Sequence, residues 1–331
     1  MKKLSLLICI FIIVSCAYEP QNELTIYTSR QPQLIEPIIE KFTDETGIKV
    51  NYLSGNAQEL MERIDVEGEK SPADIFMTVD AGVLWQAAER DIFETIDSDV
   101  LKNNIPSYLR DPNNQWFGLS KRARTIVFSN DQFSEDDFSS YEDLADPKWK
   151  GKLCLRTSKK VYNRSLMASM IDTYGFEKTK DVVSGWVSNL ATDVFSNDTN
   201  ALKAVSSGQC GMTIVNTYYF ARLLDDPQYD NLSLFWANQD DRGVHVNISG
   251  AGVVKTSKNK KNAILLLEYL SSNEAQDLYA SANKEYPVLI GAQVHESIKG
   301  WGEFKEDNIN VSTLGSLQKD AVFLAQEVNY K

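Results

Sequence analysis

The stretch LTIYTSRQPQLIEPIIEKFTDETGIKVNYLSG, residues 24–55, contains an order of elements that indicates the fold class. Apolar side chains alternate over residues 24–28, which predicts a strand, and then recur at helical spacing over residues 34–42. Gly47 stands where a residue that ends a helix is expected, and a second predicted strand follows over residues 48–55. Strand, helix and strand in this order are typical of a parallel sheet covered by helices.

The same order of elements continues along the chain. A strand is predicted at residues 73–78 and a helix at 81–90, and a later strand at 249–254 precedes two further helices. None of the first three strands is followed by a glycine-rich phosphate loop, which disfavours a nucleotide-binding domain. With 331 residues, 43% hydrophobic content and 24% charged content, the chain fits a globular protein of roughly two domains. We therefore predict an α/β protein with two lobes.

Charge and residue usage disfavour several classes of function. The formal net charge is -12, so no nucleic-acid partner is expected, because a phosphate backbone would be repelled. His245 and His295 are the two histidines, and no GxSxG nucleophile elbow is present. The short His and Cys spacings of a zinc site are also absent. We therefore expect a protein that is not an enzyme.

The first sixteen residues, MKKLSLLICIFIIVSC, have the pattern of an export signal. Two lysines precede an apolar run that is too short for a comfortable membrane span. The segment ends in IVSC, which resembles the lipobox of bacterial lipoproteins, in which the cysteine carries the lipid. We predict a signal at 1–16, lipidation of Cys16, a tether at 17–22 and a periplasmic protein anchored to a membrane. The alternative is a soluble secreted form that is cleaved near the same place.

Two cysteines remain after this segment, because Cys9 would leave with the signal and Cys16 would be lipidated. They are Cys154 and Cys210. A single pair in an oxidising compartment tends to form a disulfide, and we predict one here. Two buried thiols are the alternative, since the sequence alone does not give the distance between them.

Two adjacent tyrosines, Tyr218 and Tyr219, lie in VNTYYFARL, where an apolar strand is followed by a predicted helix. Neighbours on a strand point to opposite faces, whereas at the start of a helix both side chains can project into the same space. Asn216 or Thr217 is expected to cap this helix. Arg222 follows one turn later, where it either orients a phenolate or faces solvent.

A third tyrosine, Tyr162 in SKKVYNRS, also lies at an expected loop or turn. A phenol with a pKa near 10 is a poor ligand until a highly charged cation displaces its proton. A hard anionic oxygen of this kind suits Fe(III) better than softer divalent metals. The alternative for the tyrosine pair is packing or a sugar-stacking surface.

Several stretches make the chain similar to the iron(III)-binding proteins of bacterial ABC importers. They are residues 24–50, 72–82, 117–129, and CLRTSKKVYNRS paired with GQCGMTIVNTYYFARL, while residues 249–288 resemble part of the periplasmic solute-binding fold. The likeness covers nearly all of the mature chain. It implies a type II periplasmic binding-protein fold, with hinge-linked lobes and a ligand cleft between them. The first lobe would comprise residues 23–124 and 248–290, and the second lobe residues 125–247 and 291–331.

The resemblance also implies a function without a catalytic step. A monomeric, extracytoplasmic protein would capture Fe(III) and deliver it to an ABC permease in the inner membrane. The implied metal ligands are Tyr162, Tyr218 and Tyr219. A disulfide between Cys154 and Cys210 would tie the two ligand segments together.

The chain departs from this family in the first lobe. Many members have a histidine after the arginine of the first loop, whereas here Arg30 is followed by Gln31 and Pro32, and Val79 stands where some members have a glutamate. We therefore expect water or a small anion such as carbonate to complete the coordination. Arg30, Gln31 and Arg124 are candidates to hold that anion, with surface or inter-lobe ion pairs as the alternative for both arginines. The alternative function is a solute-binding lipoprotein for a small organic or phosphorylated anion.

Overall fold

The computed structural model describes residues 22–331. The predicted signal, Cys16 and all but the last residue of the predicted tether therefore lie outside the described residues. Within the described part of the chain, no helix has the length and apolar character needed to cross a membrane.

The first part of the chain alternates strands and helices as the sequence predicts. The elements are β1 (Glu23–Thr28), α1 (Glu36–Thr46), β2 (Lys49–Ser54), α2 (Ala57–Glu67), β3 (Ile75–Thr78) and α3 (Ala81–Glu89). β1 lies between β2 and β3 and is parallel to both. Gly47 ends α1 in the left-handed conformation, with φ of 69°, and Asp80 caps α3 by accepting a hydrogen bond from the backbone N–H of Val83. The predicted parallel arrangement is thus confirmed for β1, β2 and β3, whereas β8 (Val246–Val253) pairs antiparallel with β3.

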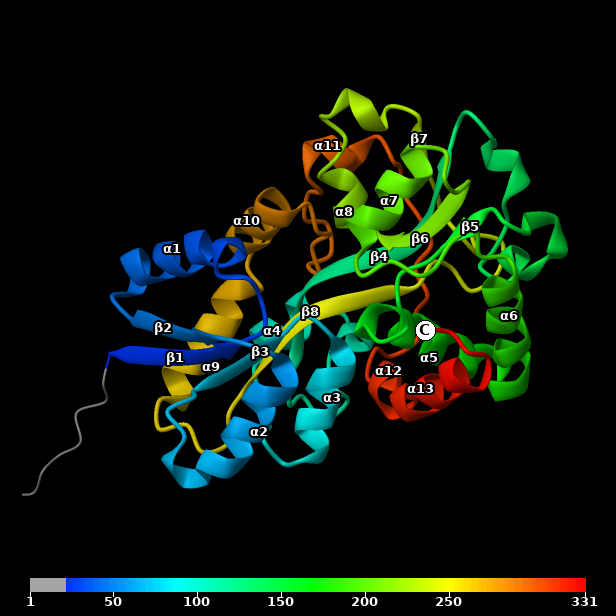
Figure 1. Cartoon of the computed structure of the whole chain (residues 1–331). Coiled ribbons are helices and arrows are strands. Elements are labelled where there is room, and N and C mark those ends of the chain that lie inside the picture. Colours follow the sequence, from blue (N-terminus) through cyan, green and yellow to red (C-terminus); the bar gives the residue numbers. More distant parts are fainter. Residues whose placement is uncertain (1–21) are drawn as a thin grey trace, which may run out of the picture.

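Two strands run from one lobe to the other (Figure 1). They are β4 (Phe117–Ser129) and β8 (Val246–Val253). β4 pairs with β8 as far as Ala123 and then, from Arg124 onward, with β6 (Met212–Asn216). The described residues form one sheet in the order β2-β1-β3-β8-β4-β6-β5, with β5 at Leu153–Cys154 and β7 (Leu232–Phe235) pairing with β4. The partner of β4 therefore changes between Ala123 and Arg124.

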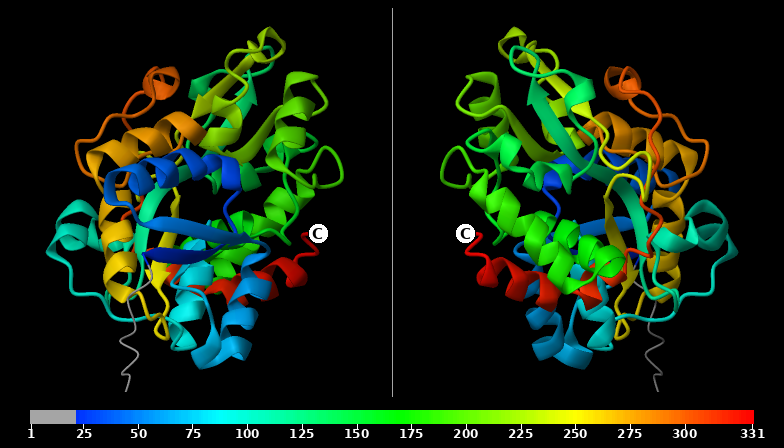
Figure 2. Two further views of the ribbon diagram at one scale, coloured as in Figure 1. Left: turned by 90° about the vertical axis from the view of Figure 1, so that its left-hand side faces the viewer. Right: turned by 90° about the vertical axis from the view of Figure 1, so that its right-hand side faces the viewer.

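Helices cover both faces of the sheet in each lobe. In the first lobe, α9 (Lys260–Leu270) and α10 (Asn273–Asn283) lie on one side of the sheet, and α2 and α3 lie on the other (Figure 2). In the second lobe, α7 (Asp198–Ser206) and α8 (Thr217–Ala221) lie opposite α5 (Val161–Tyr174) and α13 (Gln318–Glu327) (Figure 1). The other helices are α4 (Asp99–Asn104), α6 (Phe176–Ser188), α11 (Glu296–Lys299) and α12 (Thr313–Ser316). The fold is an α/β type with two lobes, as predicted.

The largest two clusters of buried apolar side chains correspond to the two lobes. One gathers side chains from residues 24–119 and 248–288, together with Val311 and Leu314. The other gathers side chains from residues 123–246 and 321–330. Val311 and Leu314 thus pack with the first lobe, although they lie within the range 291–331 that we assign to the second. The exact lobe boundaries stay a prediction.

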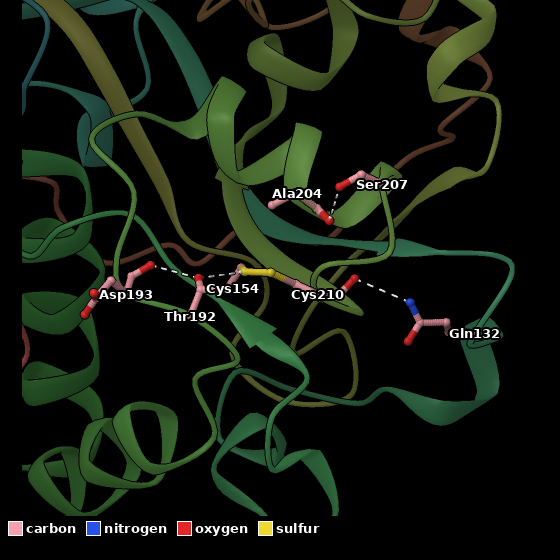
Figure 3. Close-up of a disulfide and its surroundings, with 7 residues drawn as sticks. All are labelled: Gln132, Cys154, Thr192, Asp193, Ala204, Ser207 and Cys210. Atoms are coloured by element: carbon pink, nitrogen blue, oxygen red, sulfur yellow. Dashed lines mark hydrogen bonds between the residues drawn. A yellow bond between two sulfur atoms is a disulfide. The ribbon is translucent and has the colours of Figure 1, made fainter.

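A disulfide joins Cys154, at the end of β5, to Cys210, which precedes β6 (Figure 3). Their Cα atoms lie 5.8 Å apart, within the usual range for a disulfide. β5 and β6 are parallel neighbours, with Leu153 opposite Met212. The bond therefore links the segment that leads to Tyr162 with the segment that leads to Tyr218.

Replacing both Cys154 and Cys210 by alanine should lower the free energy of unfolding by about 4 kcal/mol, because the bond closes a long loop in the unfolded chain. The two cysteines are 56 positions apart in the sequence. The measurement is denaturant unfolding of the double variant beside the oxidised wild type. Equal midpoints and slopes for the two proteins would contradict the expected stabilisation.

Candidate metal-binding site

The tyrosine pair lies in the first turn of α8, directly after β6. Tyr218 is 7% exposed, Tyr219 is half-buried, and their ring centroids are 4.5 Å apart. Both side chains line one pocket between the lobes. The strand ends at Asn216, so the two neighbours do not alternate across a sheet. The prediction that a helix start lets both phenols face the same space is confirmed.

Tyr162 lines the same pocket but lies in a helix rather than in the expected loop. It belongs to the first turn of α5, which follows the extended residue Lys160. No side chain caps this end of the helix, so the usual sequence signal for a helix start is missing. Tyr162 and Tyr218 are close enough that each affects the pKa of the other. Two separate segments of the second lobe therefore bring three phenols together.

Burial keeps two of these phenols protonated. Desolvation, followed by the neighbouring Tyr219, raises the pKa of Tyr162, although Arg122 opposes the shift. Desolvation, followed by Tyr162 and Tyr219, raises the pKa of Tyr218 well above its ordinary value. In the absence of a cation both groups are thus neutral at neutral pH. A cation that binds here has to displace their protons.

Three arginines surround the phenols. The guanidinium carbon Cζ lies 5.5 Å from the Tyr162 ring centroid for Arg122 and 5.0 Å for Arg156. That of Arg222 lies 5.1 Å from the Tyr218 ring and 5.7 Å from the Tyr219 ring. Positive charge over an aromatic face is favourable, and it also attracts anions to the pocket.

Arg122 also lines the pocket, although it was not predicted from the sequence. It is 2% exposed, its Nη2 donates to the Val79 carbonyl, and its buried Nη1 has no hydrogen-bond partner. The spacing between Arg122 and Arg124 could have indicated that Arg122 is a second candidate, because residues two apart on a strand lie on the same face. Arg156 was also missed, since no pattern in the sequence marks it.

In the first lobe, Arg30 and its partners Ser249 and Glu285 line the pocket. Arg30 is 2% exposed; its Nη2 forms an ion pair with Oε2 of Glu285 at 2.7 Å, and its Nη1 donates to Ser249 at 2.9 Å. Although burial alone would raise the pKa of Glu285, Arg30 holds that pKa below its usual value. Gln31 is exposed and also lines the pocket. Glu285, whose carboxylate forms the ion pair with Arg30, was not predicted from the sequence.

Arg124, expected as an anion-binding candidate, does not line this pocket. It is 2% exposed and forms a buried ion pair with Asp198 at 2.9 Å. Each of its side-chain N–H donors has a hydrogen-bond partner. We therefore correct the expectation for Arg124, because no donor is left for an anion.

The pocket has a volume of about 140 Å³ and combines residues of both lobes. Contacts between the lobes border it, with Arg222 donating to Asn283 and Lys284 Nζ donating to the Ala221 carbonyl at 2.9 Å. Within residues 22–331, no group of three or more His, Cys, Asp or Glu side chains is placed to hold a metal ion. Three phenolic oxygens converge in this pocket, whose lining also includes the side chains of Gln31 and Glu285.

Two α/β lobes are joined by crossing strands around a small polar pocket. This arrangement is that of a type II periplasmic binding protein. Residues 27–277 match the model of the bacterial extracellular solute-binding proteins. The chain belongs to this family.

Similar proteins include several that are named for iron. The chain is 44% identical to iron uptake protein A1 of Synechocystis sp. over 317 residues, which cover 94% of this chain and 88% of that protein. IdiA (FutA) of Trichodesmium, solved in complex with iron and citrate ligands, matches with 44% identity, a TM-score of 0.90 and coverage of 93% and 100% of the two chains. Ferric iron-binding protein A of Mannheimia haemolytica, solved in an open conformation, matches with 42% identity, a TM-score of 0.86 and coverage of 93% and 99%.

Proposed function

We propose that this protein is the Fe(III)-binding component of an ABC iron importer and that it binds iron through the phenolates of Tyr162, Tyr218 and Tyr219. The observation that carries the proposal is the convergence of these three phenols in one small pocket between the lobes. The similarity to iron uptake and ferric-binding proteins supports the same ligand.

The chemistry of the pocket suits a trivalent cation. Fe(III) displaces the phenolic protons, and three phenolate charges balance the charge of the ion, which limits the cost of burying it. A hard cation also prefers anionic oxygen ligands. The donors come from the second lobe alone, so that lobe can capture iron before the first lobe closes over it.

The remaining coordination positions are assigned to water or to a small anion such as carbonate. Arg122 offers its unpartnered Nη1, and Gln31 and Arg30 line the opposite wall. We assign the anion to these three residues, with Arg122 in the place that the sequence analysis gave to Arg124. Guanidinium groups recognise carboxylate-like anions through paired N–H donors.

Bicarbonate should strengthen iron binding by about tenfold or more in the wild type, and Arg122→Gln should remove most of that gain, because a charge-assisted hydrogen bond to the anion is lost. The measurement is Fe(III) affinity with and without added bicarbonate. Arg242→Gln is the control, since Arg242 lies outside the pocket. An Arg122→Gln protein with the full bicarbonate effect would contradict the assignment.

In the cell, the protein would act as a monomer in the periplasm and deliver iron to a permease in the inner membrane. A lipid on Cys16 would keep it close to that permease. Release of iron would follow phenolate protonation, reduction of the metal or opening of the lobes. The protein itself would carry out no catalytic step.

Titration of the iron-free protein with Fe(III) tests the proposed function. A visible tyrosinate-to-iron charge-transfer band should grow until one equivalent of iron has been added. A protein that shows no band and retains no iron after dialysis would rule out the ferric function.

A second candidate ligand is a small organic or phosphorylated anion. The observation that favours it is the presence of Arg30, Arg122 and Arg222 in the same pocket. Equilibrium dialysis of the iron-free protein against phosphate and simple carboxylates separates the candidates. Tight anion binding without iron, together with no charge-transfer band, would favour this second function.

A further inference from the structure

Arg124 uses every N–H donor of its guanidinium in one buried network. Nε and Nη2 both donate to Oδ1 of Asn163, at 2.9 and 2.7 Å, and Nη2 also donates to the Ile214 carbonyl at 2.9 Å. Nη1 donates to Oδ2 of Asp198 at 2.9 Å and to Oδ1 of Asn216 at 3.1 Å. Since the guanidinium is planar and rigid, it fixes the relative positions of these acceptors.

Two of these acceptors adjoin the tyrosines. Asn163 directly follows Tyr162 in the first turn of α5. Asn216 stands at the start of α8, but its side chain makes no capping hydrogen bond there. Its Nδ2 instead donates to the hydroxyl of Tyr218 at 3.2 Å. One guanidinium thus connects the two segments that carry the phenols.

Asp198 extends the network to Arg156. Its side chain is 0% exposed, and Oδ2 also accepts from the backbone N–H of Asn216 at 3.1 Å. Oδ1 lies 3.4 Å from Nη1 of Arg156, whose Cζ lies 5.0 Å from the ring centroid of Tyr162. A buried carboxylate with partners on both oxygens has a fixed place, because losing a partner would leave a charge uncompensated.

The C-terminal end of the chain orients the amide of Asn163. The chain end lies beside α5 (Figure 1). The hydroxyl of Tyr330 accepts from Asn163 Nδ2 at 2.7 Å and donates to the Arg156 carbonyl at 2.6 Å. With Nδ2 held in this way, Oδ1 of Asn163 faces Arg124.

We propose that Arg124 and Asp198 act together as positioning residues for the metal site. They set the separation between Tyr162 and the Tyr218–Tyr219 pair before iron arrives, and this preorganisation determines the iron affinity of the second lobe. The inference rests on the proposed ferric function and adds to it the residues that hold the ligands.

The Arg124→Lys variant tests this role. Lysine keeps the charge but lacks the planar fork, so it does not hold Asn163 and Asn216 at the same time. We expect Fe(III) affinity to fall by about 10- to 100-fold, as is usual for loss of a group that orients metal ligands. The charge-transfer band per bound iron should also shift in wavelength or weaken, an effect that lower stability alone would not produce.

Arg242→Lys is the matched control. Arg242 is also buried in the second lobe and forms an ion pair with Asp307 at 2.7 Å, but it does not line the pocket. This variant should melt at a lower temperature and keep the wild-type affinity and band. A folded Arg124→Lys protein with the same unchanged affinity and band would overturn the proposal.

Two milder variants keep the inference testable if Arg124→Lys does not fold. Tyr330→Phe and Asn216→Ala each remove one link of the network, and each should weaken iron binding by about 3- to 10-fold. Wild-type affinity in both variants would overturn the positioning role. A wild-type protein without the band would instead reject the ferric function on which the role depends.

Discussion

The Tyr218→Phe/Tyr219→Phe double variant is expected to lose the charge-transfer band and to bind Fe(III) at least about four orders of magnitude more weakly than the wild type. Two of the three anionic ligands are then missing, so Tyr162 alone does not balance the charge of the ion. The measurement is affinity by competition with a chelator, together with the visible spectrum.

The substitution itself should be structurally mild. Phenylalanine keeps the two rings, whose centroids lie 4.5 Å apart, and their contacts with Arg222. The hydrogen bond from Asn216 to Tyr218 is lost, at a cost of about 1 kcal/mol. Tyr229→Phe is the control, because Tyr229 is a buried tyrosine of the second lobe outside the pocket. Full-strength colour in the double variant would contradict the ligand assignment.

Acidification is expected to weaken iron binding steeply, with the apparent affinity falling by at least about a hundredfold for each pH unit between pH 8 and pH 6. Burial raises the pKa of Tyr162 and that of Tyr218 above the ordinary phenol value, so both groups are protonated in the iron-free protein across this range. Binding therefore releases at least these two protons, and a higher proton concentration opposes it. Competition titrations at several pH values, corrected for protonation of the chelator and hydrolysis of iron, give the slope.

The Tyr218→Phe variant provides the internal check on this pH dependence. It has one fewer proton to release, so its slope should be smaller by about one logarithmic unit of affinity per pH unit. An affinity that does not change with pH in the wild type would show that no buried phenol is deprotonated on binding. Equal slopes in the wild type and the variant would remove Tyr218 from the ligand set.

The fold was predictable because local patterns change sharply at the ends of its elements. Apolar alternation in β1 gives way to helical spacing in α1 within a few residues, and Gly47 ends that helix with φ of 69°. The tyrosine pair was predictable for a similar reason, since the apolar strand β6 ends just before it. Tyr162 was misplaced in a loop because Lys160, at the start of α5, provides no capping side chain.

Arg30 was named from the sequence and lines the pocket, but the different places of Arg122 and Arg124 were not predictable. Arg122 and Arg124 share one face of β4, yet the first reaches the pocket and the second is buried in an ion pair. The strand changes partner between Ala123 and Arg124, which no local pattern signals. The partners are also distant, because Asp198 is 74 residues from Arg124 and Glu285 is 255 residues from Arg30. Such pairs depend on how whole lobes pack.

We expect three phenolic oxygens of the second lobe to bind the iron. Anomalous diffraction at the iron absorption edge, on crystals of the iron-loaded protein, tests this expectation most directly. One strong peak is expected within about 2 Å of the hydroxyl oxygens of Tyr162, Tyr218 and Tyr219. An iron peak elsewhere in the molecule, or a pocket that holds an anion and no iron, would contradict it.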